Sequence, residues 1–110
     1  MNVLKELRYA NRERHREWPG SETIDLSFRT IEFGEEAGEV LGAVKKYTRS
    51  LRGIKGSKCS LEDIKDEMGD VLVTLDLLAD DLDIDLTDAV VSKFNKTSSK
   101  YDLKTRLRCW

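Results

Sequence analysis

Six acidic side chains in two short stretches have the types and spacings that suit metal chemistry. The first stretch carries four glutamates: Glu32, Glu35, Glu36 and Glu39. At about 100° of rotation per helical residue, these four fall within one arc of roughly 100° and share one helix face. The second stretch adds Glu67 and Asp70. Because like charges this close repel each other, the pattern indicates a compensating cation.

The spacing within each stretch indicates which cation fits. Glu36 and Glu39 form an i, i+3 pair, and so do Glu67 and Asp70. If the two helices pack antiparallel, the pairs face each other and offer four carboxylates to one site. Oxygen ligands alone suit Mg²⁺ or Mn²⁺, which are commonly shared with phosphates. His15 is the only histidine, so the Glu-x-x-His pairs of di-iron bundles are absent.

Basic residues are concentrated in two other segments, 45–58 and 93–108. The first has no acid, and Asp102 is the only acid of the second. Both segments are available to hold an anion, so the pattern as a whole indicates magnesium together with a polyphosphate. The alternative is that these charges are solvated helix faces.

Four amphipathic helices position these residues. They are expected over residues 2–17, from about Ile24 to Arg49, from the Ser60 cap to about Leu82, and from about Leu86 to Ser99. Trp18 to Ser21 forms a break. With no period-2 segment, the chain is predicted to be an all-α four-helix bundle.

Two helix faces predict close packing. The second helix carries Gly34, Gly38 and Gly42 at a spacing of four, which suggests the close approach of another helix backbone. On the fourth helix, Ala89, Val90 and Phe94 are expected to be buried. The second helix is therefore expected to be central, or to lie at a subunit interface.

Length and composition predict one domain over residues 1–110, with its core in 24–100 and a tail at 101–110. The chain has 21 acidic and 19 basic residues, a net charge of −2, which does not favour nucleic acid or a membrane as partner. Cys59 and Cys109 are expected to be free thiols. Without a signal peptide or an apolar span, the location is expected to be cytoplasmic.

The paired acidic motif resembles that of the MazG-like all-α nucleoside triphosphate pyrophosphohydrolases, which are related to the dimeric dUTPases. The family signature is EExxE followed by ExxD, here residues 35–39 and 67–70. Residues 93–100, KFNKTSSK, are similar to the family's fourth-helix phosphate-binding segment. The resemblance covers roughly residues 24–108.

The resemblance implies hydrolysis of an NTP or dNTP to a monophosphate and pyrophosphate, in nucleotide-pool house-cleaning. It assigns Mg²⁺, with Mn²⁺ as a substitute, to four ligands: Glu36, Glu39, Glu67 and Asp70. Glu35 is expected to orient or deprotonate the attacking water. Glu32 lies outside the motif and is expected to be a surface carboxylate or one that supports the metal ligands.

Candidate contacts to the nucleotide lie outside the acidic motifs. Asn95 and Lys100 are the preferred phosphate ligands, with Lys93 and Lys46 as further candidates. Three residues are candidates for contact with the base: Trp18, Phe28 and His15. The alternative places Trp18 and Phe28 in the core and His15 in solvent.

By resemblance, a homodimer or homotetramer with sites between subunits is expected. A rival interpretation is a non-catalytic helical interaction module whose acidic face docks a basic partner. A third, nucleic-acid binding through the basic loop and tail, is weakened by the near-neutral charge and the lack of a recognisable reading motif.

Overall fold

A computed structural model describes residues 2–108, which form four α-helices, one short 3₁₀ turn and no strand. The all-α prediction is confirmed for this part of the chain. The elements are α1 (Val3–Glu17), η1 (Ser21–Thr23), α2 (Leu26–Leu51), α3 (Leu61–Asp81) and α4 (Leu86–Lys100).

Each α-helix begins at a side-chain cap. Asn2 accepts a hydrogen bond from the backbone N–H of Lys5, as predicted, and Asp85 caps α4. Ser60 and Asp63 form a reciprocal capping box at the start of α3. The helix α2 begins two residues later than predicted, because Asp25 caps it and the preceding residues form η1.

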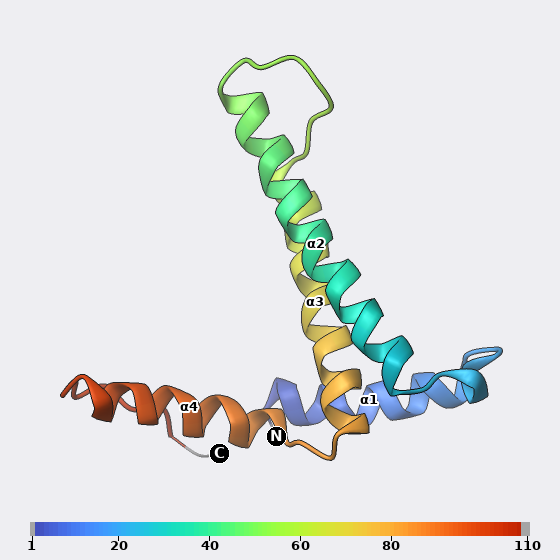
Figure 1. The fold of residues 1–110 in the computed structure, drawn as a ribbon, viewed down its shortest axis with the longest axis vertical. Coiled ribbons are helices and arrows are strands. Elements are labelled where there is room, and N and C mark those ends of the chain that lie inside the picture. Colours follow the sequence, from blue (N-terminus) through green and yellow to red (C-terminus); the bar gives the residue numbers. More distant parts are fainter. Residues whose placement is uncertain (1, 109–110) are drawn as a thin grey trace.

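The long helices α2 and α3 run antiparallel, side by side, and α1 and α4 lie across one end of this pair (Figure 1). The basic loop after α2 forms the opposite end of the pair. The helix α4 packs on α1 and extends away from the α2–α3 pair (Figure 1). Within one chain, the two basic segments therefore lie at opposite ends of the molecule.

A single chain leaves much apolar surface uncovered. Val90 is 47% exposed and Phe94 is 41% exposed, so the prediction that they are buried is wrong for one chain. A hollow of about 350 Å³ on the α2–α3 pair is lined by apolar side chains: Ala37, Val40, Met68, Val71 and Leu72. A Cβ placed on Gly34, Gly38 or Gly42 would meet no atom within 4 Å. The close helix contact expected at these glycines is therefore absent among the described residues.

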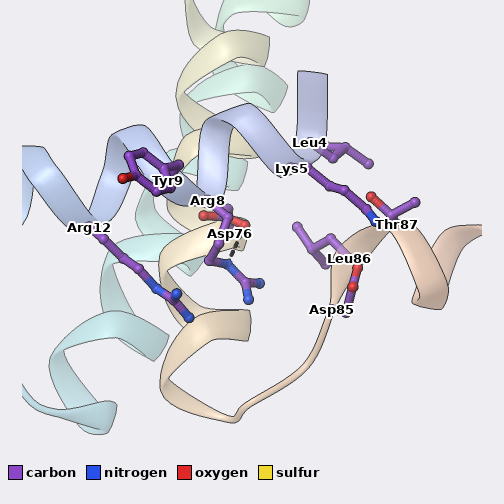
Figure 2. Close-up of a pocket in the computed structure, with 9 residues that line it drawn as sticks. All are labelled: Leu4, Lys5, Arg8, Tyr9, Arg12, Asp76, Asp85, Leu86 and Thr87. Atoms are coloured by element: carbon purple, nitrogen blue, oxygen red, sulfur yellow. Dashed lines mark hydrogen bonds and ion pairs between the residues drawn. The ribbon is translucent and has the colours of Figure 1, made fainter. Parts of the chain in front are cut away.

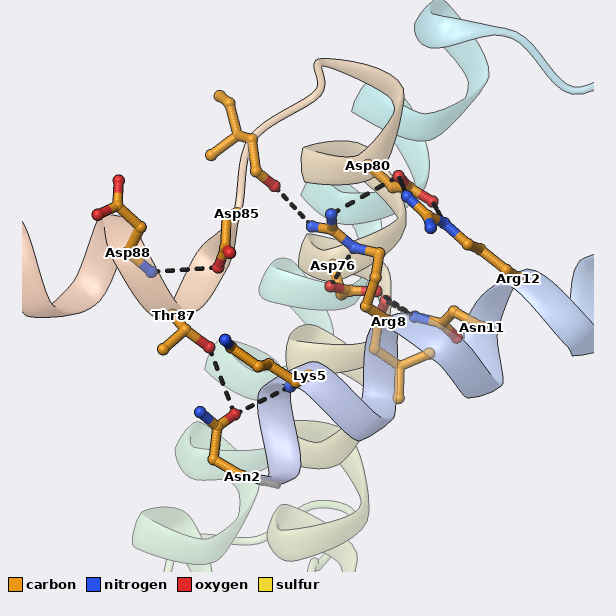
Figure 3. Close-up of polar contacts among 12 residues, drawn as sticks. Asn2, Lys5, Arg8, Asn11, Arg12, Asp76, Asp80, Asp85, Thr87 and Asp88 are labelled. Carbon is orange, nitrogen blue, oxygen red and sulfur yellow. Dashed lines mark hydrogen bonds and ion pairs between the residues drawn. The ribbon is translucent and has the colours of Figure 1, made fainter. Parts of the chain in front are cut away.

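A buried polar interface holds α1 on α3 (Figure 3). Asp76 of α3 is fully buried and accepts from Arg8 Nε at 2.9 Å and from Asn11 Nδ2 at 3.0 Å. Asn11 Nδ2 also donates to the carbonyl oxygen of Val73 at 3.1 Å. Arg12 binds Asp80 through two nitrogens, at 2.9 and 2.7 Å. Both carboxylate oxygens of Asp76 are thus satisfied by side chains of α1.

A cavity of about 260 Å³ borders this interface, between α1 and the start of α4 (Figure 2). Arg8 crosses it and donates to the carbonyl oxygen of Ile84 at 2.6 Å. Asp76 and Asp80 neutralise the charge of Arg8, which thereby links α1 to α3 and to the segment before α4. No helix within residues 2–108 is long and apolar enough to cross a membrane.

The substitution Asp76→Ala should lower the free energy of unfolding by about 3–5 kcal/mol, because it leaves the Arg8 guanidinium without its buried partner. Urea unfolding followed by circular dichroism measures this change. Glu62→Ala is the matched control, since it breaks an exposed ion pair with Lys65 on the same helix and should cost under about 1 kcal/mol. Equal losses in the two variants would contradict the importance assigned to Asp76.

Candidate active site

The acidic motifs of α2 and α3 meet where the two helices pack. Carboxylate oxygens of Glu36, Glu67 and Asp70 lie within 4.8 Å of one another. A second group on α2 joins Glu35, Glu36 and Glu39 at the same limit. Glu36 belongs to both groups, so the predicted meeting of the two motifs is present in the structure.

The carboxylates of this cluster have no ion-pair partner among the described residues. The pKa of Glu36 is raised to about 7, first by desolvation and then by the neighbouring carboxylates. The pKa of Glu67 is also raised, first by the neighbouring carboxyl group of Glu39 and then by desolvation. One oxygen of Glu36 and one of Glu67 are buried with no hydrogen-bond partner among the described residues. Such buried oxygens are costly unless a cation or proton meets them.

The cluster fits a hard divalent cation. Every side chain in it offers oxygen, which Mg²⁺ and Mn²⁺ prefer. Carboxylate oxygens within 4.8 Å of one another are close enough for one ion to be shared among them. Two of these carboxylates, Glu36 and Glu67, each have a buried oxygen without a hydrogen-bond partner among the described residues, which a cation would satisfy.

A cavity of about 350 Å³ adjoins the cluster, and Glu36 and Asp70 form part of its wall. His15, Trp18 and Phe28 line the same cavity. Trp18 is 61% exposed and Phe28 is 49% exposed, so the interpretation that these rings belong to the core is wrong for one chain. The structure thus brings all three candidate base contacts next to two candidate metal ligands.

Arg29 also lines this cavity, and its side chain is only 7% exposed. Its Nη2 lies 3.0 Å from His15 Nδ1, and its Nη1 lies 3.4 Å from Glu32 Oε1. Glu32, which lies outside the acidic motif, is thereby engaged by a cation instead of the cluster. The i, i+3 spacing of Arg29 and Glu32 is visible in the sequence, but the burial of Arg29 is not.

The candidate phosphate ligands of α4 are not brought to the carboxylates within one chain (Figure 1). Asn95 Nδ2 donates to the carbonyl oxygen of Leu107 at 2.9 Å, and Asn95 Oδ1 accepts from the Leu107 N–H at 2.7 Å. Its amide therefore holds the tail. Lys100 Nζ lies 5.4 Å from the centre of the Tyr101 ring, and Lys93 is exposed.

The remaining sequence candidates occupy various positions. Lys46 is half-buried on α2, two turns beyond Glu39 and outside the cavity wall. Cys59 is a free thiol, as predicted, whereas Cys109 lies outside the described residues.

The sequence analysis did not identify Asn11, which is 4% exposed and lines the cavity. The i, i+4 spacing of Asn11 and His15 on a helix was the available signal.

Comparisons with known proteins agree with this geometry. The family model of the MazG nucleotide pyrophosphohydrolase domain matches residues 30–102, which include both acidic motifs. The chain is also similar to the Gene 37 protein of Mycobacterium phage L5, with 33% identity over 89 residues that cover 77% of each chain. No solved structure matches the chain. On its two acidic motifs and this family match, the chain belongs to the MazG nucleotide pyrophosphohydrolase family.

Proposed function

We propose that this protein is a Mg²⁺-dependent nucleoside triphosphate pyrophosphohydrolase that converts an NTP or dNTP to the monophosphate and pyrophosphate, as in nucleotide-pool house-cleaning. The observation that carries the proposal is one cavity whose wall contains both acidic groups and aromatic rings. Glu36 and Asp70 lie along it together with Trp18 and Phe28. A molecule with a base at one end and phosphates at the other matches this division.

The carboxylates of the cluster hold the metal in this proposal. The four ligands are Glu36, Glu39, Glu67 and Asp70, and Mn²⁺ substitutes for Mg²⁺. When bound, the ion supplies neutralisation of the phosphate oxygens and a more acidic water. Glu35 is exposed beside Glu36 and Glu39, where it can accept the proton of a water that attacks a phosphorus of the α–β phosphoanhydride. The bond from that phosphorus to the bridging oxygen breaks, and the monophosphate and pyrophosphate separate.

The base end of the cavity contributes binding rather than chemistry. Trp18 and Phe28 present aromatic faces on which a base can stack. Their exposure in the free protein indicates that they have apolar surface to bury against a ligand. Stacking there orients the nucleotide with its phosphates toward Glu36 and Asp70.

A second copy of the chain completes the site in this proposal, as a homodimer or as a pair of dimers. The candidate phosphate ligands on α4 stand apart from the carboxylates of their own chain (Figure 1). Met68 and Leu72 beside the cluster are about half exposed, and no atom of residues 2–108 lies within 4 Å of a Cβ placed on the glycine face of α2. A neighbouring subunit would cover these surfaces and bring its own Lys93 and Lys100 to the phosphates.

The first test is the reaction itself. Incubation with Mg²⁺ and each NTP and dNTP should release pyrophosphate and the monophosphate in equal amounts. Glu36→Gln and Asp70→Asn should each lower kcat/KM more than about 100-fold, because even residues that only support metal ligands are worth 10–100-fold. Glu22→Gln, an exposed change in η1, is the control. Turnover undiminished in Glu36→Gln, or no turnover at all, would favour the docking-module interpretation.

The second test follows the proton that competes with the metal. The pKa of Glu36 is about 7 in the folded protein against 4.5 ordinarily, so the folded state retains a proton that the unfolded state loses. Without divalent ions, Tm should therefore fall as pH rises from about 5 to about 7, and level off above. Saturating Mg²⁺ at pH 8 should restore much of the loss, because the cation replaces the proton.

Glu36→Gln should remove most of that fall in Tm and weaken the effect of Mg²⁺. Differential scanning calorimetry with EDTA and with Mg²⁺ measures both effects, and Glu22→Gln again serves as control. A wild-type Tm that rises between pH 5 and 7 without metal would contradict this account of the cluster.

The third test asks whether the site is shared between subunits. Glu36→Gln and the double variant Lys93→Ala/Lys100→Ala should each be nearly inactive alone. Co-expressed in equal amounts, they should recover about a quarter of wild-type activity, because half of the dimers would be mixed and each would hold one intact site. No recovery in mixed dimers separated by two affinity tags would show that α4 does not act across the interface.

A further inference from the structure

Two polar side chains of α1 face the cavity from the same side of the helix. Asn11 and His15 are four residues apart on α1, so they are neighbours on its surface, and both line the cavity. The proposed function gives neither residue a role in metal binding or proton transfer. Each is fixed in one hydrogen-bonding state by its surroundings, which determines what it offers to a ligand.

The hydrogen-bonding state of His15 is set by Arg29. A guanidinium has five donors and no acceptor, so at 3.0 Å from Arg29 Nη2 the Nδ1 atom of His15 must be the acceptor. The ring hydrogen then lies on Nε2, the opposite nitrogen. His15 is thus a neutral imidazole with one N–H donor left for another partner.

The amide of Asn11 is oriented by acceptors on α3. Its Nδ2 donates to Asp76 Oδ2 at 3.0 Å and to the carbonyl oxygen of Val73 at 3.1 Å (Figure 3). Because both partners are acceptors, a flipped amide would lose both bonds. No donor among the described residues binds Asn11 Oδ1, so this oxygen remains as an acceptor.

We propose that Asn11 and His15 select nucleotides whose base carries a lactam edge, a carbonyl oxygen beside a ring N–H. His15 Nε2–H donates to the carbonyl oxygen, and Asn11 Oδ1 accepts from the ring N–H. Uracil, thymine, guanine and hypoxanthine have this edge. Adenine and cytosine present an amino group beside an unprotonated ring nitrogen. The N–H of His15 would then face the amino group, which is also a donor, and Asn11 Oδ1 would face the ring nitrogen, which is also an acceptor. This inference rests on the proposed function and names its substrate class.

Arg29 is a positioning residue in this scheme, since it acts through the tautomer of His15. Its own burial and its ion pairs with Glu32 and Asp81 hold the guanidinium in place. The buried Nε of Arg29 has no hydrogen-bond partner among the described residues.

Two matched substrate pairs test the proposal with the full-length enzyme and Mg²⁺. dITP and dATP share a purine skeleton and differ at the edge in question, as do dUTP and dCTP among pyrimidines. We expect kcat/KM to favour dITP and dUTP by at least about tenfold, because the wrong edge leaves buried polar groups unpaired. Equal kcat/KM values within both pairs, or a preference for dATP and dCTP, would overturn the proposal.

Variants separate recognition from folding. His15→Phe retains a ring but no donor. The kcat/KM ratios of dITP to dATP and of dUTP to dCTP should therefore both fall toward one, mainly through a higher KM for dITP and dUTP. Arg29→Met should weaken the preferences in the same way, and Arg29→Lys, which still donates, should restore part of them. A preference that survives in a folded His15→Phe protein would overturn the role given to His15.

The tautomer is measured without any substrate. His15 is the only histidine of the chain, so a long-range ¹H–¹⁵N spectrum at pH 8 contains a single imidazole. The Nε2–H form supports the proposal, and the Nδ1–H form overturns it.

Calorimetric binding of the four nucleotides separates this inference from the proposed function. If no nucleotide is hydrolysed but dUTP binds more tightly than dCTP, the base selection stands without the reaction. If none binds, both proposals fail.

Discussion

A single buried carboxylate fixes the position of α1 on α3, and the cavity depends on that position. Asp76 accepts from Arg8 and Asn11, so the desolvation of its charge is offset by two hydrogen bonds, one of them from a cation. One turn further along α1, His15 then lies over the cavity that Glu36 and Asp70 border. An apolar residue in place of Asp76 could pack α1 on α3, but it would not orient the amide of Asn11.

The second constraint is the mutual repulsion of the acidic cluster. Packing α2 on α3 buries oxygens of Glu36 and Glu67 without partners and raises the pKa of both residues. The apolar contact between the helices must therefore offset an unfavourable electrostatic term in the free protein. A cation bound among these carboxylates would relieve a penalty that folding has already imposed.

Local sequence signals predicted the features that depend on neighbouring residues. The caps Asn2 and Ser60 and the four helices follow from spacings within one or two turns. The meeting of the two acidic motifs follows once their two helices pack antiparallel. Individual side-chain contacts between distant residues were not predictable. Arg8 and Asp76 are 68 residues apart, and the bond of Asn95 to the tail requires a chain reversal at Asp102, whose φ is +60°. Residue type alone could not show that Arg29 is buried or that Phe94 is exposed.

Several apolar residues are exposed in one chain although their spacing is that of buried residues. Val90 and Phe94 on α4 and Met68 and Leu72 on α3 follow the helical spacing of buried residues, yet each is at least 41% exposed. The hydrophobic pattern of a sequence reflects which residues are buried in the functional assembly. The structure of one chain shows only the residues that this chain buries by itself. The same disagreement occurs on α2, where Val44 is 40% exposed and Leu51 is 71% exposed. The surfaces that a partner would cover are thus those beside the acidic cluster and on the helix that carries Lys93 and Lys100.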